Sequence, residues 1–296
     1  MENEGRRRAL KFFVTACVIS AMYYFVMENL RPSIEVDGGS REIIGAPARI
    51  VAVAKNTRKA SRAIKAGFDE LTRINRIIGE DINRVNSEAF AGPVKVSPEL
   101  FEVLQTGIDY SKLSKGAFDI TVADANTPGG YEKLVLDTNK QTVQFAAEGL
   151  RLDLGGIGKG YAVDKAVEIM KRKGAIGGLV DSGGIISCFG KPGRGGNWLI
   201  GTSAFSVQRV ADSNADSNEN GMVLKLRDMA VATKVSGVTI IAPKADEAET
   251  IALAVNVLGA QKGLDLVDSL LGVEAIIVTP EGKVVKSSGV DVYISH

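Results

Sequence analysis

The segment RLDLGGIGKGYAVDKAVEIM, residues 151–170, constrains the fold more than any other stretch of this chain. Its first residues alternate between polar and apolar, which is typical of a strand, and its last residues follow a helical period. Four glycines, at positions 155, 156, 158 and 160, lie between the two parts. Glycine lets the backbone approach another group closely. We therefore predict a strand that turns sharply into a helix over residues 162–173, which Gly174 ends.

Two interpretations of this glycine loop stay open on the residues alone. The spacing fits neither G-x-G-x-x-G nor G-x-x-x-x-G-K-[ST], because the later glycines are two apart and Tyr161 follows the pair Lys159-Gly160. Backbone N–H groups at the start of a helix can still bind an anion, and Lys159 adds a cation there. The loop is therefore a pyrophosphate cradle, or only a tight turn with an exposed lysine.

The composition excludes several kinds of site. The chain has 296 residues, 45% of them hydrophobic, which is enough for a substantial core. A net charge of +1 means that the chain lacks the excess of basic residues typical of nucleic-acid-binding proteins, and we expect no nucleic-acid partner. Cys17 and Cys188 are too few for a disulfide framework or a cysteine zinc site. The single histidine, His296, excludes Ser-His-Asp chemistry and multi-histidine metal sites.

The first 31 residues are typical of a membrane anchor. Three arginines at positions 6–8 precede an apolar run over residues 12–27, which can span a bilayer together with its flanks. The basic flank should stay cytoplasmic, which predicts a single-pass anchor in the cell (inner) membrane with residues 32–296 on the outer, periplasmic side. The stretch VTAC resembles a lipoprotein box, so a lipid anchor at Cys17 is the runner-up. A cleaved signal peptide lacks a good Ala-x-Ala site.

The remaining chain is predicted to be a linker over residues 32–42 and one domain over residues 43–296. We expect a strand at residues 48–54, a helix at residues 61–78, and a second helix that Ser97 caps and Pro98 opens. Residues 137–140 form the turn of a hairpin, and GGLVDSGGIISCFG forms two strands around a glycine turn. Residues 211–221 form a polar loop. One face of the first helix is apolar: Ala63, Ile64, Phe68, Leu71, Ile74 and Ile78.

Several segments, in order, resemble the FAD:protein FMN transferase family, formerly called the thiamine-biosynthesis lipoprotein family. LDLGGIGKGYAVDKA resembles its signature most closely, and the likeness extends from about residue 43 to residue 290. Further similar segments are IIGAPARI, GAFDITV (residues 116–122), VDSGGII (180–186) and MAVAT (229–233). The resemblance implies an α+β fold of mixed, mostly antiparallel sheets with packed helices.

The resemblance also implies a chemistry, namely Mg²⁺-dependent transfer of FMN from FAD to a threonine of an acceptor protein. Lys159 and Asp181 would then be the catalytic residues. The pyrophosphate would be held by Gly155, Gly156, Gly158, Lys159 and Gly160, and the metal by the Gly158 carbonyl and Glu249. The flavin would lie against Asp181, Ser182, Gly183, Gly184 and Thr233, with Asp119 and Thr121 at the pocket floor. For Asp119 a cap of a helix or turn is the alternative.

The chain departs from the family pattern where the chemistry should occur. The family segment His-Ile-x-Asp-Pro-x-Thr-Gly, with the histidine needed for transfer, is absent from VATKVSGVTIIAP. In the metal-binding helix Glu249 stands for an aspartate and Leu253 for a threonine. Three hypotheses remain: an active transferase with Asp181 as the acid–base group, a flavin-binding pseudoenzyme or flavin-trafficking module, and a membrane-anchored structural protein without flavin.

Overall fold

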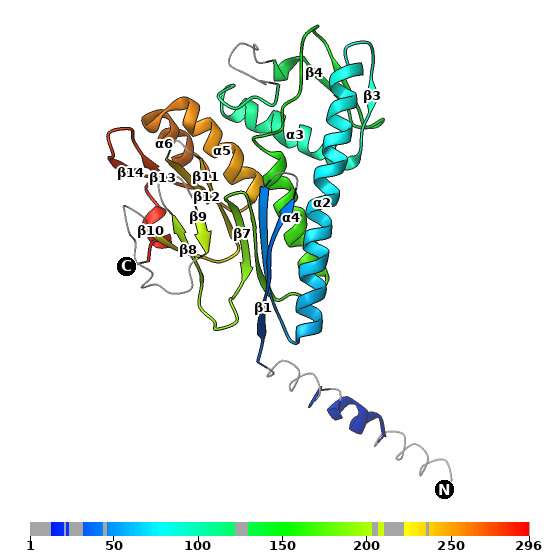
Figure 1. Cartoon of the computed structure of the whole chain (residues 1–296), viewed down its shortest axis with the longest axis vertical. Coiled ribbons are helices and arrows are strands. Elements are labelled where there is room, and N and C mark those ends of the chain that lie inside the picture. Colours follow the sequence, from blue (N-terminus) through cyan, green and yellow to red (C-terminus); the bar gives the residue numbers. More distant parts are fainter. Residues whose placement is uncertain are drawn as a thin grey trace.

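The computed structural model describes residues 13–20, 22–23, 32–43, 46–121, 130–202, 207–209, 222–234 and 237–295. At its centre lies an eight-stranded sheet in the order β1-β2-β6-β7-β11-β12-β13-β14 (Figure 1). Every neighbouring pair in this sheet is antiparallel. The strands are β1 (Ile34–Ile43), β2 (Ala46–Ala54), β6 (Gly177–Ser182), β7 (Ile185–Gly190), β11 (Met229–Lys234), β12 (Val238–Ala242), β13 (Glu274–Val278) and β14 (Val284–Lys286).

Helices and two three-stranded sheets surround the central sheet. The helices are α2 (Thr57–Glu88), α3 (Pro98–Leu113), α4 (Gly158–Arg172), α5 (Ala245–Leu258) and α6 (Ala260–Asp268), with single turns η1 (Tyr131–Lys133) and η2 (Val290–Tyr293). One small sheet has the order β10 (Met222–Leu226), β8 (Trp198–Thr202), β9 (Val207–Arg209). The other has the order β3 (Val94–Lys95), β5 (Thr142–Phe145), β4 (Leu134–Asp137), and lies with α3 at the top of Figure 1. The fold is therefore α+β, as the resemblance implied.

The central sheet separates two hydrophobic cores. On β2, Ile50 and Ala52 belong to the larger core, which also contains the buried side chains of α2, α4 and α5. Val51 and Val53 point the other way, into a smaller core with Trp198 of β8. Successive residues of a strand face opposite sides, so neighbours in the sequence reach different halves of the molecule. We call these the helix face and the small-sheet face.

Helices α4 and α5 cap each other. Neither has a cap from its own N-cap side chain. Instead Asp164 of α4 accepts from the N–H groups of Ala245 and Asp246 at 3.0 Å, at the start of α5. In return Glu249 of α5 accepts from the N–H of Gly160 at 2.9 Å, in the first turn of α4. Each carboxylate therefore satisfies N–H groups that a helix start leaves without a helical partner.

Most elements predicted from the sequence are present. The apolar face of α2 is buried, and Ser97 caps α3 by accepting from Leu100 N–H at 3.2 Å. The hairpin at residues 137–140 and the two strands around the glycine turn also form. Helix α4 begins at Gly158 instead of residue 162, because its first turn is capped from α5 and by no local side chain. Gly158, Lys159 and Gly160 are thus helical residues.

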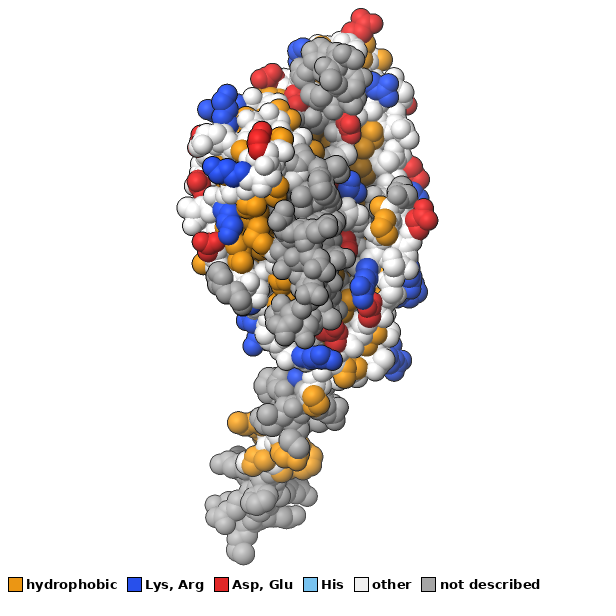
Figure 2. All heavy atoms as spheres, turned by 60° about the vertical axis from the view of Figure 1, so that its left-hand side comes forward, with side chains coloured by type: hydrophobic (Ala, Val, Ile, Leu, Met, Phe, Trp, Pro, Cys, Tyr) orange, Lys and Arg blue, Asp and Glu red, His pale blue; other side chains and the backbone are white. Residues whose placement is uncertain are grey.

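The N-terminal part differs from the prediction at the linker. Most of the segment 32–42 forms β1, because Ile34 and Val36 alternate inward and pair with β2. Much of the predicted anchor and the loop 211–221 lie outside the described residues. Residues 13–20 and 22–23 are helical and exposed, and Figure 2 shows hydrophobic side chains along this segment. In the described parts of the chain, none of the helices has the length and apolar character that a membrane span requires.

The contact between α4 and α5 predicts opposite effects for two neighbouring glycines. A Cβ on Gly160 would overlap the Ala245 carbonyl oxygen, whereas a Cβ on Gly158 would meet only Leu154 Cβ, at 3.8 Å. Gly160→Ala should therefore lower the free energy of unfolding by about 2 kcal/mol or more. Gly158→Ala should leave it equal or slightly higher, because alanine favours a helix. Urea unfolding of both variants is the measurement, and equal stabilities would contradict this packing.

The cap on α5 predicts a pH dependence of stability. Burial and the neighbouring Asp246 raise the pKa of Asp164 to about 7. The folded chain then binds this proton more tightly than the unfolded chain, so the contribution of Asp164 to stability is full below pH about 4 and is lost as the pH rises through 7. Between pH 5 and 7 the free energy of unfolding should fall by about 2 kcal/mol through this group.

Asp164→Asn is the test of that assignment. Asparagine keeps one oxygen acceptor for the start of α5 but has no titrating proton. Urea unfolding at several pH values should therefore give a flatter profile for the variant than for the unmodified chain. Two parallel profiles would show that Asp164 is not the group responsible.

Candidate functional site

The glycine loop reaches α4 from an extended segment that α2 holds in place. The Asn86 side chain accepts from the N–H of Leu152 at 2.7 Å and donates to the Leu152 carbonyl at 3.1 Å. One residue later, Asp153 Oδ1 accepts from the N–H of Gly155 at 2.8 Å. The position at which the chain turns is therefore set by a side chain of α2.

Several N–H groups of the loop already have partners inside the chain. Gly155 is bound by Asp153, as described above. The carbonyl of Leu154 accepts from Ile157 N–H at 3.1 Å and from Gly158 N–H at 2.8 Å. These bonds close a tight turn directly before α4. The N–H groups of Gly155, Ile157 and Gly158 are therefore bound within the loop and do not form an open binding site for an anion.

The first turn of α4 holds an anion, and that anion is Glu249. Its Oε2 accepts from the N–H of Gly160, and its Oε1 lies 3.4 Å from Lys159 Nζ. The Glu249 side chain is 0% exposed, whereas that of Lys159 is 41% exposed. A helix start with a cation beside it attracts negative charge. A carboxylate of the chain itself therefore occupies the start of α4, and binding of a pyrophosphate at this loop stays a prediction.

The residues expected at the metal do not make a magnesium site in this arrangement. Mg²⁺ requires oxygen ligands in near-octahedral geometry. Leu253, at the position of the family's threonine, offers no oxygen, and its side chain fills the space beside Gly156. The Glu249 carboxylate is already engaged, and Gly158 lies within α4. No group of three or more His, Cys, Asp or Glu side chains suited to a metal occurs in the described residues.

Thr250 of α5 also binds the glycine loop. Thr250, which is fully buried, donates its hydroxyl to the Gly156 carbonyl at 3.1 Å. This bond ties α5 to the loop one residue after Glu249. Together with the contact of Leu253, it leaves the glycine loop packed directly on α5.

Asp119 and Thr121 close a turn in front of the segment 122–129, which lies outside the described residues. Asp119 Oδ1 accepts from the Thr121 N–H at 2.8 Å and from its hydroxyl at 2.6 Å, and Oδ2 accepts from Gly130 N–H at 2.9 Å. Thr121 Oγ1 accepts from the same N–H at 2.8 Å. The geometry is that of a turn cap, and a role at a flavin pocket floor stays a prediction.

The turn between β6 and β7 places its residues on different sides. Gly183 and Gly184 form it with φ of 60° and 83°, values that favour glycine. Ser182 is buried and points to the helix face, because it follows the parity of Val180. Asp181 has the opposite parity and lies on the small-sheet face, beside Arg49 of β2. The structure therefore does not bring Asp181 to the face that carries Lys159.

Burial raises the pKa of Asp181 to about 6, against the N–H of Gly184 and the charge of Arg49, which both lower it. Thr233 of β11 also lies on the small-sheet face, since it shares the parity of Val231. Its hydroxyl lies 2.8 Å from that of Thr239 on β12. Asp181 and Thr233 thus share a face, and Lys159 with the glycine loop lies on the other.

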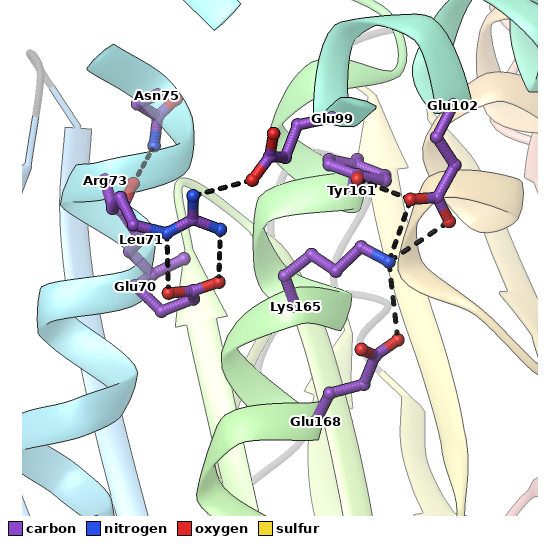
Figure 3. Close-up of polar contacts among 9 residues, drawn as sticks. All are labelled: Glu70, Leu71, Arg73, Asn75, Glu99, Glu102, Tyr161, Lys165 and Glu168. Carbon is purple, nitrogen blue, oxygen red and sulfur yellow. Dashed lines mark hydrogen bonds and ion pairs between the residues drawn. The ribbon is translucent and has the colours of Figure 1, made fainter. Parts of the chain in front are cut away.

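A polar network that was not predicted from the sequence lies beside the first turns of α4 (Figure 3). The Tyr161 hydroxyl donates to Glu102 of α3 at 2.7 Å, and Lys165 bridges Glu102 and Glu168. The neighbouring Arg73 of α2 binds Glu70 and Glu99. The spacing of residues 161, 165 and 168, one face of a helix, was the only sequence signal for it. Asp164 was missed as well, because its partners are 81 and 82 residues away.

This chain is similar to several known proteins. FAD:protein FMN transferase of Treponema pallidum is 25% identical over 263 residues, which covers 70% of this chain and 72% of that protein. The protein of the same name from Haemophilus influenzae is 26% identical over 245 residues, covering 66% and 71%. The crystal structure of the ApbE protein of Thermotoga maritima superposes with a TM-score of 0.74 at 20% identity, covering 89% of this chain and 100% of that one.

The sequence model of the ApbE family matches residues 44–127 and 123–277. The matched region contains the glycine loop, the turn between β6 and β7, and helix α5. It also spans well over half of the chain. This chain therefore belongs to the ApbE family, as the resemblance at residues 151–170 indicated.

Proposed function

We propose that this chain is a flavin-nucleotide-binding member of the ApbE family that holds the pyrophosphate of FAD at the start of α4 and does not carry out metal-assisted transfer of FMN. The observation that carries the proposal is the position of the Glu249 carboxylate, which contacts the Gly160 N–H and Lys159. The first turn of α4 and Lys159 hold a carboxylate there, whereas the residues around them offer too few oxygen ligands for Mg²⁺. The chain thus keeps the anion-binding half of the site.

In this proposal Lys159 and the first turn of α4 bind the phosphates, and Gly156 serves packing against α5. The flavin ring would lie at the turn formed by Gly183 and Gly184, which ends β6 at the same end of the sheet as the start of α4. Helix α4 ends at Arg172 and β6 begins at Gly177, so the chain turns back after α4. The end of β6 therefore lies toward the start of α4, which supports that position. Ser182 is the residue of this turn that points to the helix face.

Transfer of FMN to a threonine of an acceptor protein is the second candidate. The names of the relatives favour it, and so does Asp181, whose pKa of about 6 suits acid–base work near neutral pH. Mg²⁺ would supply charge neutralisation of the pyrophosphate in such a reaction. Asp181 acts in this candidate only if the substrate reaches the small-sheet face.

We also propose that the N-terminal segment anchors the domain to the cell membrane. The basic residues at positions 6–8 and the apolar run after them support a single-pass anchor, with a lipid on Cys17 as the alternative. The described part of this segment exposes apolar side chains, among them Phe13, Val18 and Ile19. Exposed apolar side chains in a row are typical of a surface that contacts lipid or protein.

The central prediction separates binding from transfer. The full chain is incubated with FAD, Mg²⁺ and a threonine-bearing acceptor, then filtered, and the retained flavin and released AMP are measured by HPLC. We expect retained FAD and no AMP above a protein-free control. Release of AMP would favour the second candidate. Absence of both signals would mean that the chain has the fold of the family but neither binds FAD nor transfers FMN.

Lys159 should be the main determinant of affinity for the phosphates. Lys159→Ala should weaken binding of FAD at least tenfold in a fluorescence titration, while Lys159→Arg, which keeps the charge, should retain most of the affinity. Lys173→Ala, an exposed lysine at the other end of α4, is the matched control and should bind like the unmodified chain. Unchanged affinity in Lys159→Ala would contradict binding at the glycine loop.

A further inference from the structure

We propose that Glu249 is a built-in competitor for the anion site, so that binding of a nucleotide pyrophosphate exchanges the Glu249 carboxylate for a ligand phosphate and proceeds without Mg²⁺. This inference rests on the proposed function and concerns regulation of the same site. It assigns Glu249 a role opposite to that of a metal ligand, because a competitor lowers the affinity for the nucleotide whereas a metal ligand raises it.

The anion site at the start of α4 is occupied by groups of the chain itself. Gly160 N–H and the Lys159 ammonium, the donor and the cation that a phosphate would use, are both bound to Glu249. Gly155, Ile157 and Gly158 donate to acceptors within the loop. A phosphate that binds the Gly160 N–H must therefore replace the Glu249 carboxylate there.

The charge of Glu249 opposes the binding of a phosphate. Glu249 is fully buried, so water does not screen its carboxylate well from a phosphate brought beside it. Glu249 forms an ion pair with Lys159, and a phosphate bound beside Lys159 would share this cation with the carboxylate. Leu253, which lies beside Gly156, offers no oxygen ligand for a metal ion that could bridge them. Ligand binding is therefore opposed by like-charge repulsion until the carboxylate moves.

Helix α5 itself is held in place by contacts other than that of Glu249. Asp164 binds its first two N–H groups, and Thr250 binds the Gly156 carbonyl. The close contact of Gly160 with Ala245 also prevents a shift of α5 toward α4. The movement that releases the site is consequently a rotation of the Glu249 side chain and not a displacement of the helix.

The test is the nearly isosteric variant Glu249→Gln, which keeps an oxygen for the Gly160 N–H but removes the charge. In the full chain we expect it to bind FAD and ADP at least tenfold more tightly than the unmodified chain, by fluorescence titration and calorimetry, with the same result in Mg²⁺ and in EDTA. Riboflavin, which has no phosphate, should bind both proteins equally. Glu247→Gln, on the same helix, is the control and should bind like the unmodified chain.

Each outcome decides the inference. Equal or weaker binding of FAD by Glu249→Gln overturns it, as does an affinity of the unmodified chain that rises with Mg²⁺ and loses this rise in the variant. If the unmodified chain binds FAD and the variant gains nothing, the inference alone fails. If neither protein binds FAD or ADP, the proposed function fails with it.

A second variant guards against misfolding of the first, and circular dichroism and urea unfolding check both. Glu249→Asp keeps the charge but shortens the side chain by one methylene, which withdraws the carboxylate from Gly160. Its affinity for FAD should lie between those of the unmodified chain and Glu249→Gln. An affinity at or below that of the unmodified chain would count against the competitor role.

Discussion

The mutual capping of α4 and α5 is the interaction on which the other features of this molecule depend. Two helix starts, neither capped by its own N-cap side chain, receive carboxylates from one another, Asp164 in one direction and Glu249 in the other. This arrangement requires the helices to approach until the backbone of Gly160 touches that of Ala245. It also decides which anion occupies the first turn of α4. Stability and ligand binding are therefore coupled at one contact.

The central sheet imposes a second constraint, because it divides the residues of the family signature between two faces. Lys159 belongs to a helix on one side, while Asp181 and Thr233 point to the other. The turn at Gly183 and Gly184 lies at the end of the sheet, between β6 and β7. A ligand that contacts Lys159 and Asp181 together must therefore bend around the end of the sheet. A long dinucleotide meets this condition more easily than a small molecule.

Local signals were sufficient for much of the fold. The period of the apolar residues in α2, the Ser97 cap and the paired strands of the glycine hairpins depend on neighbours in the sequence, and all were predicted. The strand β1 was not, because the Asp37-Gly38-Gly39 stretch interrupts its alternation and produces an irregular register with β2. For the same reason α4 was predicted to begin late, since its cap comes from a residue 89 positions away.

The site was predictable in its composition but not in its arrangement. The sequence predicted anion binding at the glycine loop, and it predicted that part of the family's metal ligands is missing. Both predictions rest on residue types. It could not indicate that Glu249 would take the anion's place, or that Asp181 would face away from Lys159. The first depends on the distance between two helices, and the second on the parity of a single strand residue. Neither quantity is encoded within a short window of sequence.

The shared caps have a consequence for the motions of the chain. Local opening of a folded protein occurs in cooperative units, and the amide protons of one unit exchange with solvent together. The starts of α4 and α5 lie far apart in the sequence, yet neither can unwind without removing the acceptors of the other. They consequently form a single unit of local unfolding, in which unwinding of either helix start exposes the amides of both.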